Sequence, residues 1–231
     1  MRGFGIGRMI VGLAALGAMA LGAGYAFGAS EAITSSPSCC TYTKATFTID
    51  AGQVANFDNG TAGTSHTVTA PTKGPDKNAL FDSGTTPGGG QSPVDGTQYL
   101  AAGTYHFICE IHGPSMSADL VVTGNGTPVA RPEIGVKVLS RKLDGVVSSG
   151  KLKVKLSAST QSDGVSLTAR KGAKKLGSKR NIDLSAGASR TVKLPLTAAG
   201  KNALEDLSFA KVKVTGSVPF GAPDTAKRRL H

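Results

Sequence analysis

The sequence predicts an all-β protein built as two consecutive β-sandwiches. Three observations support this: short segments that alternate apolar and polar residues, turn signals between them, and a charge that changes sign along the chain. The 231 residues are 39% hydrophobic and 18% charged, which is typical of a folded chain with one large or two small cores. Residues 30–130 carry three lysines and eight acidic residues, a net charge of −5, whereas residues 131–231 carry 21 basic and seven acidic residues, a net charge of +14. This asymmetry indicates two modules with different surroundings.

The N-terminus has the pattern of an export signal. Arg2 and Arg8 form a basic start, and residues 9–21 are an apolar run of small side chains. Residues 1–28 are therefore expected to be a signal peptide. The alternative is an uncleaved N-terminal anchor, because residues 9–27 are about long enough to span a bilayer. The expected location is exported: periplasmic, extracellular or attached to the cell surface, where conditions are oxidising.

The first module is expected to consist of short strands separated by turns. In residues 45–49, Phe47 and Ile49 fall on one face, as the two-residue period of a strand requires. Residues 71–90 are rich in loop signals, and residues 30–41 are expected to be a short tether. The expected strands are residues 45–49, 54–58, 65–70, 105–109 and 118–123.

The second module follows a linker expected at residues 125–132, where glycine and proline recur. Thr197 is expected to cap a short helix that ends at Leu207. Residues 133–218 are expected to form a smaller β-sandwich, whose pattern resembles the Ig-like sandwiches of exported bacterial proteins, and residues 219–231 a disordered tail. Inward apolar residues alternate with outward lysines in three segments, residues 151–156, 191–194 and 211–214.

One segment of the first module carries a metal-binding pattern. Cys109, His112 and Met116 form a Cys-x2-His-x3-Met sequence at the end of an expected strand. A tight loop there can turn a thiolate, an imidazole and a thioether toward one point. A fourth ligand must come from elsewhere in the chain, and His66 is the best donor.

Elimination supports the same residues. Of the four histidines, His231 is terminal, and strand alternation points His106 away from Cys109. Met116 is the only methionine that follows the signal segment. Each residue has an ordinary interpretation by itself, because a free cysteine is commonly a small buried hydrophobe and methionine commonly fills a core. Their coincidence at this spacing indicates a site.

Two imidazoles, one thiolate and one thioether suit copper best. A His2Cys set with a weak axial methionine describes a blue-copper site. Zinc gains little from a thioether, and calcium and magnesium prefer oxygen ligands. The expected cofactor is therefore one Cu(I)/Cu(II) ion bound by His66, Cys109, His112 and Met116.

Residues 44–124 resemble the cupredoxins, in particular the blue copper proteins of the plastocyanin, pseudoazurin and amicyanin type. The resemblance implies a Greek-key β-sandwich over residues 40–124, with Met116 as the axial ligand and the other three ligands equatorial. It also implies a type 1 site that passes single electrons to redox partners docking near the edge of His112. The motifs that carry it are residues 49–54, 57–59, 66–68, 81–84, 87–89 and 103–116.

The sequence favours an electron carrier over an enzyme. With Met116 in the axial position no site opens for a substrate, and four histidines are too few for the additional centres of a copper nitrite reductase or a multicopper oxidase. One alternative is an exported protein that binds and delivers copper without carrying electrons. Another is a surface-adhesion protein whose metal site is vestigial.

Two features allow several interpretations. Lysines on the outer strand faces of the second module can simply keep sheet edges soluble, or they can bind an anionic envelope polymer or a membrane surface. Nucleic acid is not an expected partner. Three cysteines cannot all pair within one chain, so Cys39 and Cys40 could form a vicinal disulfide, pair with another chain or stay reduced.

Overall fold

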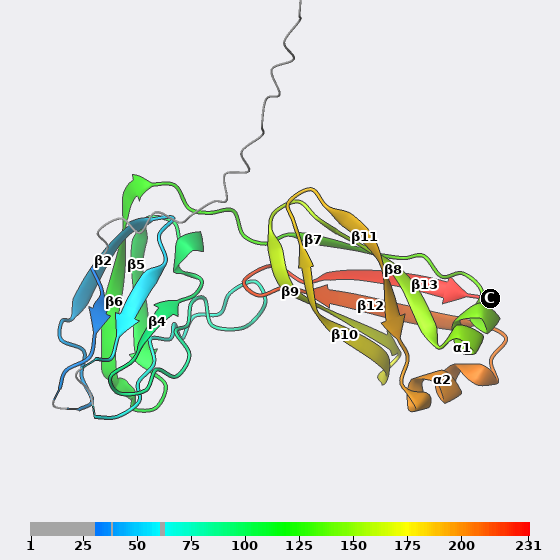
Figure 1. The fold of residues 1–231 in the computed structure, drawn as a ribbon, viewed down its shortest axis with the longest axis horizontal. Coiled ribbons are helices and arrows are strands. Elements are labelled where there is room, and N and C mark those ends of the chain that lie inside the picture. The colour runs from blue at the N-terminus through cyan, green and yellow to red at the C-terminus, as the bar shows by residue number, and fades with distance from the viewer. Residues whose placement is uncertain (1–30, 38, 61–62) are drawn as a thin grey trace, which may run out of the picture.

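The computed structural model describes residues 31–37, 39–60 and 63–231, and it contains two β-sandwich modules side by side (Figure 1). We call residues 31–126 the first module and residues 133–231 the second. The expected signal segment lies outside the described residues. Within the described part, no helix combines the length and the apolar character needed to cross a membrane.

The first module is built from two three-stranded sheets, in the orders β1-β3-β4 and β2-β6-β5. A short 3-10 helix, η1 (Thr97–Tyr99), precedes β5. β2 pairs with β6 in parallel, and β5 pairs with β6 in antiparallel fashion. The strands are β1 (Ile33–Thr34), β2 (Thr46–Ala51), β3 (Ala55–Asp58), β4 (Gln91–Val94), β5 (Gly103–Cys109) and β6 (Gly113–Gly126).

The expected alternation is confirmed in β2 and β5. Phe47 and Ile49 are buried while their neighbours on β2 face outward. On β5, Phe107 and Cys109 both face the core. The core contains an aromatic cluster in which Tyr42 lies edge-on to Phe107, with ring centroids 4.9 Å apart. Cys109 belongs to the same core as this cluster.

The predicted strand at residues 65–70 is wrong as a continuous ladder. The segment instead makes isolated bridges, from His66 to Thr86 and from Thr69 to both Asp82 and Ile108. Its alternation reflects burial of Val68 and Ala70 rather than pairing with one neighbouring strand. A segment that bonds to several neighbours in turn can carry a side chain into the interior between them.

The expected tether at residues 30–41 is also corrected. It contains β1, in which Ile33 pairs with Phe57 of β3 and is fully buried. A strand this short has too few residues to show a period, so no sequence pattern could indicate it.

The second module is a sandwich of a four-stranded sheet, β10-β9-β12-β13, and a three-stranded sheet, β11-β8-β7. The expected alternation is confirmed, because Leu152, Val154 and Leu156 are buried between exposed lysines on β8. The core is aliphatic throughout. The strands are β7 (Ile134–Val138), β8 (Lys151–Ala158), β9 (Ser162–Lys171), β10 (Lys174–Leu184), β11 (Ser189–Pro195), β12 (Ala210–Ser217) and β13 (Asp224–Leu230).

Two helices lie at the far end of this sandwich, where the sequence predicts one. The expected helix is α2 (Ala198–Glu205), and Thr197 caps it by accepting a hydrogen bond from the amide of Gly200 at 3.0 Å. The additional helix is α1 (Leu143–Ser149). Its seven residues include a glycine and two valines, which are weak helix formers, and tertiary packing of its buried leucine outweighs them.

The predicted disordered tail is wrong. Residues 224–230 form β13, which pairs with β12 along its length. Leu230 is fully buried, and the backbone of His231 bonds to Arg141 and Leu143. The three consecutive cations of this segment lie on a paired strand, with Lys227 and Arg229 exposed on one face and Arg228 half-buried on the other. The expected linker also begins later, because β6 continues to Gly126, which pairs with Ala51.

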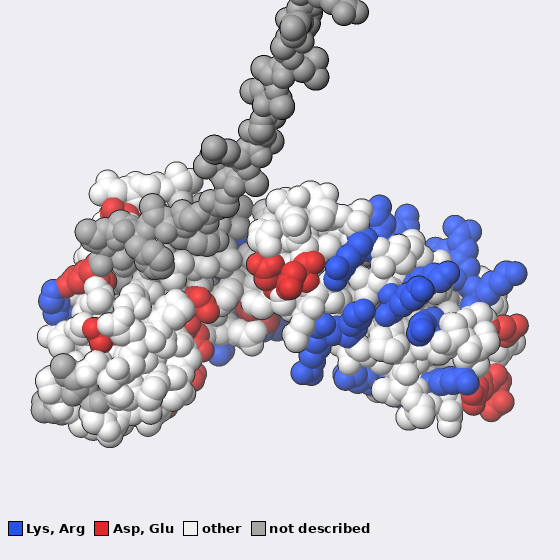
Figure 2. All heavy atoms as spheres, viewed as in Figure 1, with Lys and Arg blue, Asp and Glu red and all other residues white. Residues whose placement is uncertain are grey.

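Charge separates the modules in space as well as in sequence. Figure 2 shows lysine and arginine side chains spread over the second module, while acidic side chains gather on the first module and near the junction. The two modules also touch: the amide of Phe220 donates a hydrogen bond of 2.9 Å to the carboxylate of Asp76.

Candidate metal centre

Three side chains from separate segments meet inside the first module. The donor atoms of His66, Cys109 and His112 lie within 4.8 Å of one another. The two Nδ1 atoms are 3.2 Å apart, and the sulfur of Cys109 is 3.8 Å from Nδ1 of His66 and 3.5 Å from Nδ1 of His112. The sequence predicted this convergence from residue types and spacing.

The spacing of these donors fits a single ion. Bonds of about 2.0 Å to nitrogen and about 2.3 Å to sulfur at tetrahedral angles place two donors roughly 3.3–3.5 Å apart. The measured separations of 3.2, 3.5 and 3.8 Å bracket these values. The three residues present therefore suit a metal ion without rearrangement of the backbone.

Local structure positions Cys109 and His112 together. Cys109 is the last residue of β5, and a tight turn leads directly into β6 at Gly113. The amide of His112 donates to the carbonyl of Cys109 at 3.2 Å, and Gly113 has a φ of 66°, which favours glycine. This turn folds the imidazole back over the thiol.

His66 is fixed from both sides. Its backbone amide and carbonyl both bond to Thr86, at 3.0 and 2.9 Å, and its side chain is fully buried. Its Nε2 lies 3.1 Å from the hydroxyl of Thr64. A partner on Nε2 leaves Nδ1 directed at the cluster, and such a partner typically orients a metal-binding imidazole.

A buried amide supports this arrangement. Asn59 donates hydrogen bonds of 2.9 Å to the carbonyls of Thr64 and Thr86, and its own carbonyl accepts one from Ser35. These bonds connect Thr64, two residues before His66, with Thr86, which pairs with the backbone of His66. In the sequence, residue 59 stands out only as part of the motif at residues 57–59, since a buried asparagine and a turn asparagine look alike in sequence.

The pKa of His66 favours the neutral imidazole, which is the form that binds a metal. Burial lowers the pKa of His66, and the nearby His112 lowers it further, so the imidazole of His66 is neutral at pH 7. Burial and then Cys109 raise the pKa of Tyr42, so its phenol stays protonated and donates to the carbonyl of Thr67. The amide of Thr67 in turn points at the sulfur of Cys109 at 3.4 Å.

Met116 is fully buried on β6 within the same core. Its role as the fourth ligand stays a prediction. His106 lies outside the cluster, as strand alternation required: it is exposed and pairs with Asp119 at 2.9 Å.

A large apolar side chain is exposed next to the cluster. His112 is half-buried, and the preceding Ile111 is 51% exposed, an unusual position for a large aliphatic side chain. Ile111 was not among the predicted residues, although a lone isoleucine between two polar residues in a turn could have indicated it.

Cys39 and Cys40 form a vicinal disulfide beside this surface. Their sulfur atoms group with the ring of His112, all within 4.8 Å. Cys109 is the remaining cysteine, and it is free and buried. Of the alternatives that the sequence left open, the structure therefore contains the vicinal disulfide, at a place that no sequence pattern indicated.

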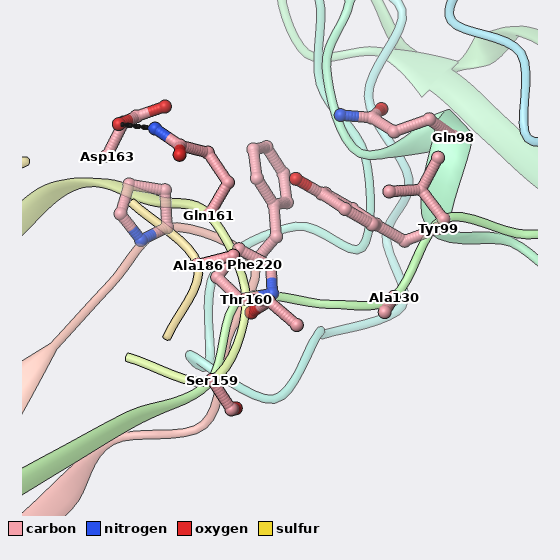
Figure 3. Close-up of a pocket in the computed structure, with 12 residues that line it drawn as sticks. Gln98, Tyr99, Ala130, Ser159, Thr160, Gln161, Asp163, Ala186 and Phe220 are labelled. Atoms are coloured by element: carbon pink, nitrogen blue, oxygen red, sulfur yellow. Dashed lines mark hydrogen bonds between the residues drawn. The ribbon is translucent and has the colours of Figure 1, made fainter. Parts of the chain in front are cut away.

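A separate cavity of about 470 Å³ lies between the modules (Figure 3). The rings of Tyr99 and Phe220, which line it, are tilted by 41° with centroids 5.8 Å apart, and the guanidinium of Arg131 lies 5.4 Å from the ring of Tyr99. Gln161 and Asp163 form its polar side, joined by a hydrogen bond of 2.6 Å. None of the lining residues belongs to the cysteine–histidine cluster, so this cavity is part of the module junction.

Comparisons with known proteins identify no family. No protein-family model matches the chain, and no curated protein matches it. Similar solved structures include a DUF3823 family protein from Bacteroides ovatus, with 12% identity, a TM-score of 0.31 and coverage of 73% of this chain and 90% of the other. A DUF3823 family protein from Parabacteroides merdae has 13% identity, a TM-score of 0.30 and coverage of 80% and 96%. Fibronectin(III)-like modules of CbhA from Clostridium thermocellum have 12% identity, a TM-score of 0.27 and coverage of 81% and 90%.

These findings correct the cupredoxin assignment of residues 44–124. The structural neighbours are DUF3823 proteins and fibronectin- or immunoglobulin-like sandwiches, not cupredoxins. The resemblance rested on short turn sequences and ligand spacing, which are too local to define a family. The all-β sandwich prediction is confirmed. The ligand prediction is independent of the family, because it follows from donor types and spacing.

Proposed function

We propose that this is an exported copper protein that binds one ion through His66, Cys109, His112 and Met116 and carries single electrons between redox partners. The observation that supports it is the convergence of two imidazole nitrogens and one buried thiol at metal-binding separations.

The donor set favours copper among the common metals. A thiol and two imidazoles are ligands that copper binds strongly, and a buried thioether on β6 adds a soft donor that zinc has little use for. A bound copper ion would supply one-electron chemistry by alternating between Cu(I) and Cu(II). The chain's own part is to hold three donors in a packed interior, where ligand movement between the two states is small.

The surroundings of His112 suit an electron path to the surface. His66 and Cys109 are fully buried, whereas His112 is half-buried beneath exposed Ile111. Transient electron-transfer encounters use small surfaces of this kind. The net charge of −5 over residues 30–130 favours partners with a basic docking face, and the preference weakens as salt is added.

Absorption and EPR spectra of the copper-loaded protein test the proposal. We expect a strong thiolate-to-Cu(II) charge-transfer band that Cys109→Ser abolishes. His106→Gln is the matched control, because His106 lies on the same strand but outside the cluster, and it should keep the band. A colourless oxidised protein, or a clear preference for Zn²⁺, would overturn the proposal.

A second experiment separates electron transfer from copper delivery, since both use the same ligands. An electron carrier should exchange electrons quickly between oxidised and reduced molecules and retain its copper against a chelator. Slow exchange together with rapid loss of copper to the chelator would favour delivery.

The second module supports an additional role in surface attachment. Lys175, Arg170, Lys213 and Lys227 lie directly opposite one another on β10, β9, β12 and β13, and all four are exposed. Like charges that face each other across strands destabilise a sheet. We call these four residues the cationic row. With strands about 4.8 Å apart, the cationic row is roughly 14 Å long. We propose that it binds a linear anionic polymer of the cell envelope, lying across the strands.

Retention on an immobilised linear polyphosphate at low salt tests this role. Charge reversal at Lys213 and Lys227 should abolish retention. Reversal at Lys153 and Lys193, which face each other on the opposite sheet, changes the net charge equally and should have a smaller effect. Equal losses in the two variants would show that only net charge matters. Retention by anionic vesicles but not by polyphosphate would favour a membrane surface. Either result contradicts polymer binding by the cationic row.

A further inference from the structure

The Cys39–Cys40 pair and the buried cluster share one residue. The sulfurs of Cys39 and Cys40 lie within 4.8 Å of His112, which also belongs to the cluster of His66 and Cys109. Cys39 is exposed and Cys40 is half-buried, whereas His66 and Cys109 are inaccessible to solvent. Two groups of soft donors therefore adjoin, one at the surface and one inside, with His112 between them.

We propose that the reduced Cys39–Cys40 pair, together with His112, is a surface Cu(I) site through which the ion reaches the buried centre. This inference rests on the proposed copper-binding function. Two thiolates and an imidazole are donors of the kind that select Cu(I). In the disulfide form neither sulfur is available as a thiolate, so the oxidised pair closes this route.

The chemistry balances with a dithiol as the reductant. A protein dithiol transfers two electrons and two protons to the Cys39–Cys40 disulfide, breaks its S–S bond and becomes a disulfide itself. Binding of Cu(I) then releases the thiol protons to solvent. On passage inward the sulfurs of Cys39 and Cys40 would be exchanged for the sulfur of Cys109 and the imidazole of His66, while His112 remains a ligand. The two released thiolates then take up two protons, one from Cys109 and one from solvent.

The pair is held in place by the fold. The segments before and after the pair are joined by the bridge between Ser35 and Tyr42 and by the bond from the Ser36 amide to the Thr41 carbonyl at 2.9 Å. Tyr42 is buried in the aromatic core and donates to the carbonyl of Thr67, next to His66. Because these contacts do not depend on the S–S bond, we expect Cys39 and Cys40 to stay beside His112 when the bond is reduced.

A purely structural role explains the disulfide poorly. A crosslink stabilises a protein mainly by restricting the unfolded chain, and the effect grows with the length of the loop that it closes. Cys39 and Cys40 are adjacent in sequence, so their bond closes almost no loop. A bond that contributes little to folding but lies beside a metal ligand is better explained by redox chemistry.

Cu(I) competition with a chelator tests the surface site by itself. In Cys109→Ser, which removes the buried sulfur, the reduced protein should bind one Cu(I), and oxidation of Cys39 and Cys40 should weaken binding at least about tenfold. Adding His112→Ala should weaken binding by a similar factor, while adding His106→Ala should have no effect. Weak binding in the reduced Cys109→Ser protein, or binding independent of His112, would overturn the inference.

Loading kinetics of the full chain separate this inference from the proposed function. With Cys109 intact, reduction of the disulfide should accelerate loading from a Cu(I)–chelator complex at least about tenfold. The Cys39→Ser, Cys40→Ser double variant should load slowly with or without reductant, yet reach the same charge-transfer band after oxidation. An absent band in this variant and in the unmodified chain contradicts the proposed function. A normal band with equally fast loading contradicts the surface site alone.

Discussion

The interiors of the two modules differ more than their folds do. Both are small β-sandwiches, but the buried polar residues described in the structure are concentrated in the first. The second contributes only Ser162, whereas the first contributes Ser35, Asn59, His66, Thr67, Thr69, Thr86 and Thr97. Burying a polar group is costly unless it is hydrogen-bonded. Several of these groups bond to the cysteine–histidine cluster or to the segments that hold it: the amide of Thr67 points at the sulfur of Cys109, the backbone of Thr86 pairs with His66, and Asn59 donates to Thr64 and Thr86.

On the outside, it is the second module that carries the more conspicuous groups. The second module has an aliphatic core and places its charge outside, in cations that face one another across strands. The first module has a modest negative charge and an aromatic core beneath the thiol. The comparison places the distinguishing groups of the first module inside it and those of the second module on its surface.

The largest expected effect is on the stability of the second module alone. Leu156→Ala removes a fully buried side chain from the aliphatic core and should lower the free energy of unfolding of that module by about 3–4 kcal/mol. Chemical denaturation followed beside the copper band should show an early transition that leaves the band intact. A band lost in the same transition would show that the modules do not fold separately.

Asn59→Ala should have the next largest effect, on the first module. It leaves the carbonyls of Thr64 and Thr86 without their amide donor, which should cost about 2 kcal/mol of stability and weaken copper affinity about 10–100-fold. Chelator competition and thermal denaturation measure the two effects. Asn56→Ala on β3 is the matched control, and equal losses in both variants would remove the supporting role assigned to Asn59.

Gly96→Ala should weaken the junction between the modules. Gly96 has a φ of 101°, and an added Cβ would lie 2.6 Å from the carbonyl of Leu80 and 2.8 Å from the ring of Phe220. Gly89 also has positive φ, at 79°, but an added Cβ there meets no neighbour. We expect Gly96→Ala to cost about 1–2 kcal/mol more than Gly89→Ala, with greater relative motion of the modules in solution scattering. Similar costs would mean that the ring contact is unimportant.

The smallest expected effect is a pH-dependent one at Asp95. Burial raises the pKa of this carboxyl, and the nearby Asp82 raises it further. A raised folded-state pKa means that ionisation destabilises the fold, so the penalty exists above that pKa and disappears as pH falls through it. Because Asp95 is exposed and solvent screens its charge, Asp95→Asn should raise Tm only slightly at pH 7 and have no effect in acid. A gain that persists in acid would point to a cause other than charge.

The metal cluster shows what local sequence can predict. Cys109 and His112 lie three residues apart, and the turn into Gly113 that joins them is a local structure. His66, which is 43 residues away from Cys109, was found only because so few histidines exist. The support from Asn59 escaped prediction, because a side chain's hydrogen-bond partners depend on how distant segments pack.

The sequence alone determined the strand faces, the cap of α2, the contrast in charge and the pairing of Cys109 with His112, because each is recorded in residue type at short spacing. Only the tertiary structure decided that Ile33 joins the first core, that the cationic residues 224–230 complete a sheet, and that Cys39 and Cys40 lie beside His112. Backbone hydrogen bonds at a sheet edge are available to almost any sequence. Which segment takes them is therefore settled by long-range packing, which leaves no local pattern.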